Sequence, residues 1–152
     1  MRQQIAFLSA FNTWLRTSDD CISLRNRLTV ENTLNIYLTI KPTEKTIKPP
    51  YMVYTLIPQR PNQFGLDQLN ISRITLQVAF YCQDVRSGGN LRQISDISYD
   101  FQKAFDSKIL TLPDNIEMTS PCLENSWVIA PEFEHTGIIE RYFFDTFFKG
   151  GQ

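Results

Sequence analysis

The stretch from Lys48 to Ile109 constrains the fold of this chain more than any other part of the sequence. It contains an apolar strand pattern at Tyr51–Ile57, then a polar excursion, a longer alternating strand pattern at Ile71–Gln83, and an amphipathic helix pattern at Leu91–Ile109. A helix pattern precedes this stretch and further strand patterns follow it. The order predicts an α+β fold, with one mostly antiparallel or mixed sheet flanked by an N-terminal helix and a long helix over about residues 90–110.

The N-terminal segment predicts an amphipathic helix over Arg2–Thr17, because its large apolar residues recur at spacings of three and four. These residues are Ile5, Leu8, Phe11 and Leu15, with Phe7 and Trp14 widening the apolar stripe. A second, shorter helix is predicted over Ile22–Leu28, with Asp20 or Ser23 as its capping residue.

Three further segments predict strands. Leu34–Ile40 alternates apolar and polar residues, and Trp127–Ala130 is followed by Ile138–Phe148 after a loop around residues 135–137. The last of these strands has large apolar residues on both faces, so it should not remain an open edge. We predict that it lies within the sheet or that a partner covers it.

The length and composition predict one domain over residues 1–152. A chain of 152 residues with 42% apolar residues can bury one substantial core. Its formal net charge of −1 argues against general nucleic-acid binding, which requires a clustered excess of Lys and Arg.

The small net charge conceals an asymmetry along the chain. Residues 1–73 carry a net charge of +4 and residues 74–152 carry −5. If the two halves formed different faces, unlike faces of neighbouring copies could meet head to tail. An even scattering of the charges in space is the favoured alternative, because sequence halves need not be spatial halves.

The cysteines Cys21, Cys82 and Cys122 are odd in number and lack a short metal-ligand spacing, so neither a full disulfide framework nor a zinc site is expected. They are typical of reduced, mostly buried thiols in a cytosolic protein. No secretory leader pattern and no apolar run of membrane-spanning length is visible, and we expect no membrane partner.

His135, the only histidine, is the central candidate catalytic residue and lies beside Glu132 and Glu134. Ser120, Cys122 or Ser126 could supply a nucleophile, but no elbow motif surrounds any of them. An exposed polar turn is the favoured interpretation, and a small enzyme centred on His135 is the weaker alternative. We expect no catalytic site, no metal site and no cofactor.

The glycine pair Gly88–Gly89 stands between a strand pattern and a helix pattern, where phosphate-binding glycines would occur. The surrounding sequence has neither the Gly-x-Gly-x-x-Gly spacing nor the Gly-Lys-Ser/Thr ending of phosphate-binding loops, so a turn is favoured. In this interpretation Asn90 caps the helix and Gln93 completes a capping box.

The polar excursion at Pro58–Asn70 supplies the candidate interaction site. Phe64 stands among polar residues, as a docking anchor at an interface would. A loop residue folded back onto the chain's own core is an equally favoured alternative.

The order of elements, together with the segments Pro49–Tyr54, Val78–Gln83 and Arg141–Asp145, resembles the tail terminator or tail completion proteins of long-tailed bacteriophages. The resemblance covers roughly residues 1–148. Its motifs are Pro-Pro-Tyr-Met-Val-Tyr, Val-Ala-Phe-Tyr-Cys-Gln and Arg-Tyr-Phe-Phe-Asp. The chain departs from the family pattern in the segments Cys21–Thr29, Pro58–Asn70 and Pro113–Asn125. Because of these departures, a neighbouring head-to-tail connector or another tail component is the alternative interpretation.

The resemblance implies a structural virion protein rather than an enzyme. Members assemble as a hexameric ring on the end of the tail tube, stop tube polymerisation and provide the docking surface for the head connector. The implied partners are further copies of the chain, the tail tube protein and the head-connector protein, with DNA only passing through the channel. The implied location is the head-proximal end of the tail, after assembly in the host cytoplasm.

Within this picture we predict that the long loop contacts the tube or a neighbouring subunit. A long exposed loop between two sheet strands can reach an adjacent ring. The predicted contact residues are Arg60, Gln63, Phe64 and Asp67.

Overall fold

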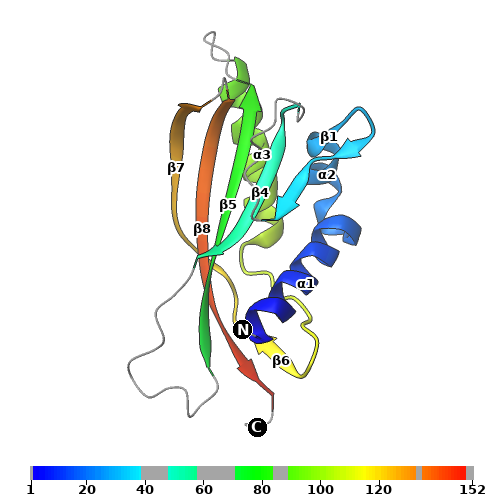
Figure 1. Ribbon diagram of the computed structural model, residues 1–152, viewed down its shortest axis with the longest axis vertical. Coiled ribbons are helices and arrows are strands. Elements are labelled where there is room, and N and C mark those ends of the chain that lie inside the picture. The colour runs from blue at the N-terminus through cyan, green and yellow to red at the C-terminus, as the bar shows by residue number, and fades with distance from the viewer. Residues whose placement is uncertain (1, 39–47, 58–70, 84–88, 133–134, 150–152) are drawn as a thin grey trace.

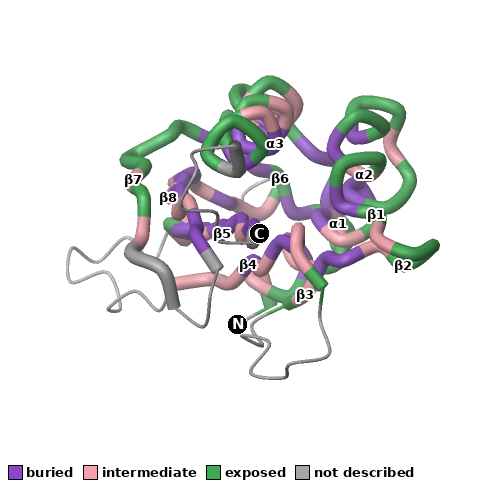
Figure 2. The backbone as a smooth tube through the Cα atoms, turned by 90° about the horizontal axis from the view of Figure 1, so that it is seen from above, coloured by how far each residue is buried: buried purple, intermediate pink, exposed green. Residues whose placement is uncertain are grey.

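The computed structural model describes residues 2–38, 48–57, 71–83, 89–132 and 135–149 (Figure 1). Three α-helices lie on one side of a twisted sheet, and the opposite face of the sheet carries no helix among these residues (Figure 2). The α+β fold predicted from the sequence is confirmed.

The helical elements follow the predicted apolar spacing closely at the N-terminus. Helix α1 spans Arg2–Thr17, a short 3-10 helix η1 spans Asp19–Cys21, and α2 spans Ile22–Leu28. The capping prediction was wrong, because Ser18 accepts the hydrogen bond from the Asp20 backbone N–H at 3.1 Å and caps η1 instead.

The main sheet is mixed. Its order is β3-β4-β5-β8-β6, and β7 also pairs with β8. The pair β3–β4 is parallel and the other pairs are antiparallel. The strands are β3 Ile36–Leu38, β4 Tyr51–Ile57, β5 Ser72–Gln83, β6 Ile116–Met118, β7 Cys122–Glu132 and β8 His135–Phe148.

Strand β8 lies inside the sheet, as its two apolar faces predicted. It pairs with β5 along one edge and with β7 and β6 along the other. Tyr142 and Phe144 are buried on the face toward the helices, while Phe143 and Phe147 are half-buried on the opposite face.

The core lies between the helices and this face of the sheet. Phe11 of α1 is fully buried at its centre, with its ring 5.1 Å from that of Tyr54 on β4 and 5.3 Å from that of Phe105 on α3. Aromatic pairs at such distances add to the free energy of burial, so Phe11 couples both helices to the sheet.

The long helix α3 spans Gly89–Phe105, so it ends several residues before the predicted boundary near residue 110. Ser107 adopts a left-handed φ of 62°, which breaks the helix well before Pro113. Ile109 is 58% exposed as a result, whereas the sequence pattern had placed it on the buried face. Asn90 lies within the first turn of α3 rather than before the helix, so it does not hold the capping position predicted for it.

The predicted strand at residues 34–40 is divided in the structure. Strand β2, Thr33–Leu34, pairs with β1, Thr29–Val30, in a separate two-stranded sheet, and β3 follows after the buried Asn35. Asn35 donates from its side-chain amide to the Lys48 carbonyl at 2.8 Å, which ties this break to the start of β4.

The last third of the chain contains more strand than predicted. Strand β6 was not predicted, and β7 begins five residues before the expected position. Residues 135–137 belong to β8 rather than to a loop. A Cβ atom at Gly137 would lie only 2.6 Å from Ile129 Cδ1, so this glycine permits close packing in the sheet rather than marking a turn.

The two halves of the sequence meet in the middle of the main sheet. Strands β3 and β4 of the positive first half lie at one edge and pair with β5, while β6, β7 and β8 of the negative second half lie on the other side of β5. Several ion pairs join the two halves, namely Arg27 with Asp96 and Asp100, Arg73 with Asp145 and Lys108 with Asp20, so unlike charges from the two halves lie side by side.

Candidate assembly surfaces

The predicted docking loop is attached at one end of the main sheet. Strand β4 ends at Ile57, and β5 begins at Ser72, which pairs with Thr146 near the end of β8. The four predicted contact residues lie outside the described residues, namely Arg60, Gln63, Phe64 and Asp67.

Next to this end, the helix-free face of the sheet carries an ion pair between neighbouring strands. Arg73 of β5 donates to both carboxylate oxygens of Asp145 on β8, at 3.0 and 3.3 Å. This hydrogen bonding raises the pKa of the Arg73 guanidinium, which also lies 5.1 Å from the centre of the Phe143 ring. A fixed cation and an aromatic ring are thus presented together on the sheet surface.

A second such group lies further along the same face. Arg141 of β8 donates to the side-chain oxygen of Gln77 at 2.9 Å, and its guanidinium lies 5.1 Å from the centre of the Trp127 ring on β7. Arginine and aromatic residues are enriched in protein interfaces. This face therefore carries side chains of the kinds that are enriched in protein interfaces.

On the opposite, buried face, β8 carries a carboxyl group that was not among the residues predicted from the sequence. Glu140 is fully buried and accepts hydrogen bonds from Ser98 and from Gln102, the latter at 2.8 Å, and from the Tyr142 hydroxyl at 2.9 Å. Desolvation raises the pKa of Glu140, and these three hydrogen bonds lower it by less. The hydrogen bonds from Ser98 and Gln102 to Glu140 fix α3 to β8.

The sequence did contain a signal for Glu140. It lies two residues before Tyr142 and four before Phe144, on the same face of a strand, where each side chain points into the core. A charged residue at such a position is expected to be paired or hydrogen-bonded.

The residues of the alternative catalytic site are not brought together. His135 begins β8 and pairs with Glu132, whereas Ser126 pairs with Glu140 and Cys122 with Phe143. At about 3.3 Å per residue, Ser126 lies roughly 16 Å and Cys122 roughly 26 Å along the strand from His135. Neither can form a hydrogen-bonded nucleophile and base with it.

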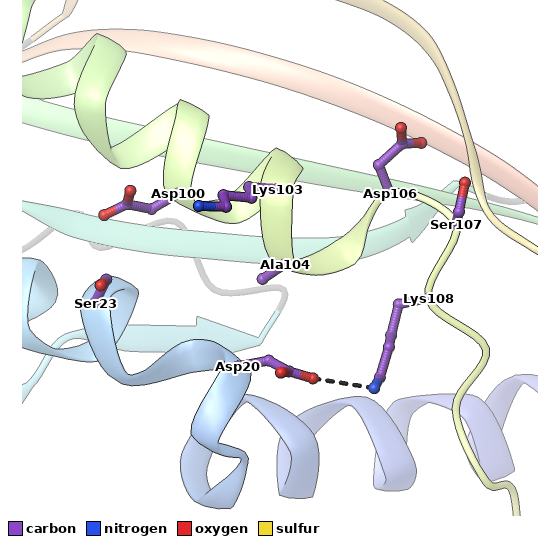
Figure 3. A pocket seen from close by; sticks show the side chains of 8 residues that line it. All are labelled: Asp20, Ser23, Asp100, Lys103, Ala104, Asp106, Ser107 and Lys108. Atoms are coloured by element: carbon purple, nitrogen blue, oxygen red, sulfur yellow. Dashed lines mark ion pairs between the residues drawn. The ribbon is translucent and has the colours of Figure 1, made fainter.

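A shallow hollow of about 420 Å³ lies between η1, α2 and the end of α3 (Figure 3). It is lined by charges of both signs, and Asp20 and Lys108 form an ion pair of 3.0 Å across it. Both of these side chains are about half exposed, so the pair stabilises little.

Neither a metal site nor a membrane-spanning helix is found in the described part of the chain. There, no three His, Cys, Asp or Glu side chains are grouped as metal ligands would be. The helices of those residues are too short or too polar to cross a bilayer.

Comparisons with known proteins identify the fold. Neither a protein-family model nor a curated protein matches this sequence. A solved chain described as part of the virion of a native gene transfer agent particle aligns with a TM-score of 0.65, covering 95% of this chain and 96% of its own at 12% identity. A second solved chain without a descriptive name aligns with a TM-score of 0.58, covering 95% and 93% at 10% identity. At these identities the likeness establishes the shared fold.

Proposed function

We propose that this chain is a structural subunit of a phage-like particle. More specifically, we propose that it forms a ring on the head-proximal end of the tail tube, stops tube polymerisation and provides the docking surface for the head connector. The observation that carries the proposal is the fold match, over nearly the whole of both chains, to a chain from a gene transfer agent virion.

The distribution of charge supports assembly into a ring. A closed ring of identical subunits needs a heterologous interface, in which one surface of each copy meets a different surface of the next. Residues 1–73 carry a net charge of +4 and residues 74–152 carry −5, so surfaces built from different halves would bring unlike charges of neighbouring copies together. Six copies would match the resemblance to tail terminators.

The contact with the tube is proposed to involve Arg60, Gln63, Phe64 and Asp67. Their segment joins β4 to β5 at the end of the sheet where Arg73, Asp145 and Phe143 form the first cation and aromatic group. Together these residues would provide one continuous surface to an adjacent ring.

We propose that this chain does not bind DNA. A protein with a net charge of −1 lacks the excess of cations that would hold phosphates, so DNA can pass through a channel lined by such subunits.

The test is made in cells that produce the particle. Deletion of this chain should give tails of uncontrolled length, and so should the double substitution R60A/F64A in an otherwise folded subunit. The matched control is K103A/I109A, which removes one exposed basic and one exposed apolar side chain elsewhere. Tail lengths are measured by electron microscopy.

The outcomes separate the possible positions in the particle. Overlong tails in the deletion strain support a terminator. Tails of normal length that lack heads would instead identify a neighbouring connector component, and complete particles without this chain would refute the virion role.

A further inference from the structure

A groove of about 580 Å³ lies between α1 and the segment that follows α3. Ser9, Ala10, Thr13 and Trp14 of α1 form one wall, and residues 109–113 form the other. The segment passes α1 on its way from α3 to β6 (Figure 1). The volume lies in the range of roughly 300–1,000 Å³ that is typical of ligand sites. We name this feature the α1 groove.

The wall opposite α1 has the alternation of a β-strand. Ile109 and Thr111 are exposed, whereas Leu110 and Leu112 are buried and belong to the core. A period of two is typical of extended backbone. Among the described residues, no strand of either sheet pairs with this segment.

The backbone of the segment has no hydrogen-bond partner in the described part of the chain. None of the residues 109–112 donates or accepts a hydrogen bond there, whereas Ser107, Lys108 and Pro113 on either side all do. Backbone N–H and C=O groups of native proteins are satisfied by other protein groups or by water. The segment is therefore an unpaired strand edge that lies beside an open groove.

Trp14 adds an unpaired donor at the same groove. Its side chain lines the groove and is only 8% exposed, and its indole N–H has no acceptor within the described ranges. Buried donors are almost always paired, so this wall lacks an acceptor. The carbonyl groups of a peptide backbone are acceptors of this kind.

The charge of the groove favours a neutral ligand. Lys108 is the one charged side chain among the described residues that line it, and its ammonium group forms a 3.0 Å ion pair with Asp20. The other side chains of the groove are apolar or carry hydroxyl groups. No cation or anion is thus left for a ligand of opposite charge.

We propose that the α1 groove binds an extended, neutral peptide segment of another protein, which adds to residues 109–112 as a β-strand. Strand addition takes its affinity from backbone hydrogen bonds and its specificity from alternate side chains. Inward side chains of the added strand would contact Ala10 and Trp14, so apolar residues are expected at every second position. The site goes beyond the proposed function, because it requires neither a ring nor a tail tube.

The test compares two variants that each place a phenylalanine on the exposed side of α1. T13F fills the groove, because Thr13 is an exposed residue of its wall. I5F is the matched control, because Ile5 is 60% exposed and lies outside the groove lining. Both should unfold at the same urea concentration as wild type.

The probe is a displayed library of short random peptides, selected on the purified full chain. We expect enriched peptides in which apolar residues alternate with polar ones. These peptides should bind wild type and I5F alike, and T13F about tenfold or more weakly.

Backbone N-methylation distinguishes strand pairing from simple burial of apolar side chains. Methylation of every second amide nitrogen of a selected peptide removes the donors along one edge and leaves its side chains unchanged. In a strand, successive N–H groups point to opposite edges, so one methylated set should weaken binding by about tenfold or more and the other by less than about threefold.

Trp14 fluorescence locates the bound peptide. In W127F, Trp14 is the one remaining tryptophan of the chain, and its emission should shift when a selected peptide is added. The proposal is overturned if selection yields no peptide that T13F binds more weakly than I5F does. Equal effects of the two methylated sets, or an unchanged emission of Trp14, would also overturn it.

The tail-length test is independent of this one. Overlong tails in the deletion strain, with no peptide bound in the α1 groove, would refute the peptide site and leave the proposed function standing. Complete particles without this chain, together with a peptide bound in the groove, would show the converse.

Discussion

The Tyr142 hydroxyl donates a 2.9 Å hydrogen bond to Glu140, two residues earlier on the same buried face of β8. Ser98 and Gln102 of α3 donate to the other carboxyl oxygen, so one side chain joins the helix to the middle of the sheet. Position 140 can hold a buried carboxyl group because three hydrogen-bond donors surround it. Removal of the carboxyl group would leave these donors without their acceptor.

We predict that E140A destabilises the chain by about 2–4 kcal/mol, since it creates a cavity and leaves buried hydroxyl groups without their acceptor. E140Q keeps the volume and one acceptor, and should cost about 1 kcal/mol or less. The free energy of unfolding in urea at neutral pH provides the measurement. The control E124A, at an exposed residue of β7, should change it by less than about 0.5 kcal/mol. Equal values for E140A and E124A would contradict the assigned role.

The same carboxyl group should make stability depend on pH. Burial raises the pKa of Glu140 above its ordinary value of 4.5, so the folded chain retains this proton to higher pH than the unfolded chain. The stabilisation from this proton is complete below the unfolded pKa and is lost as the pH rises through the folded pKa.

The prediction concerns the difference between wild type and E140Q, because other groups titrate equally in both. As the pH rises from about 4 to about 8, the free energy of unfolding of wild type should fall relative to that of E140Q. Urea unfolding at several pH values measures this difference. A constant difference, or a relative rise for wild type, would be the wrong sign for a carboxyl group with a raised pKa.

The elements with strong periodicity were predictable from the sequence. Helix α2 has the predicted boundaries, and the strand predicted at Ile71–Gln83 differs from β5 by one residue. In β5 the apolar residues that alternate along the strand are buried, and in α2 Leu24 and Leu28 are buried although Ile22 is exposed. The end of α3 was mispredicted because Ile109 continues the helical spacing, while the backbone turns at Ser107. A single left-handed residue leaves no periodic signal.

The remaining errors arise where tertiary contacts determine the local structure. Strand β6 has only three residues and exists because it pairs with the end of β8, and a pairing so distant in the chain has no local pattern. The candidate surfaces were predictable only in part. The charge difference between the halves was visible, but the exposure of Val128 and Ile22 depends on which strands and helices lie at the margins.

Gly137 gives a prediction about packing between β5, β8 and β7. A Cβ atom there would lie 2.6 Å from Ile129 Cδ1 and 3.0 Å from Tyr81 Cδ1. We predict that G137A destabilises the chain by about 1–3 kcal/mol through overpacking. The double variant G137A/I129A should recover part of this cost relative to I129A alone, measured by a double-mutant cycle in urea. Strict additivity of the two substitutions would show that Ile129 is not the obstacle.

The cysteines should differ sharply in reactivity. Cys21 and Cys82 are fully buried, and burial raises the pKa of each thiol to about 12, whereas Cys122 is exposed at the start of β7. Since the thiolate is the reactive form, a thiol reagent at pH 8 should modify one cysteine rapidly in the folded chain and all three in denaturant. Mass spectrometry of the modified protein identifies the site. C122S should abolish the rapid reaction, and its persistence in that variant would mean that β5 or η1 opens readily enough to expose a core thiol.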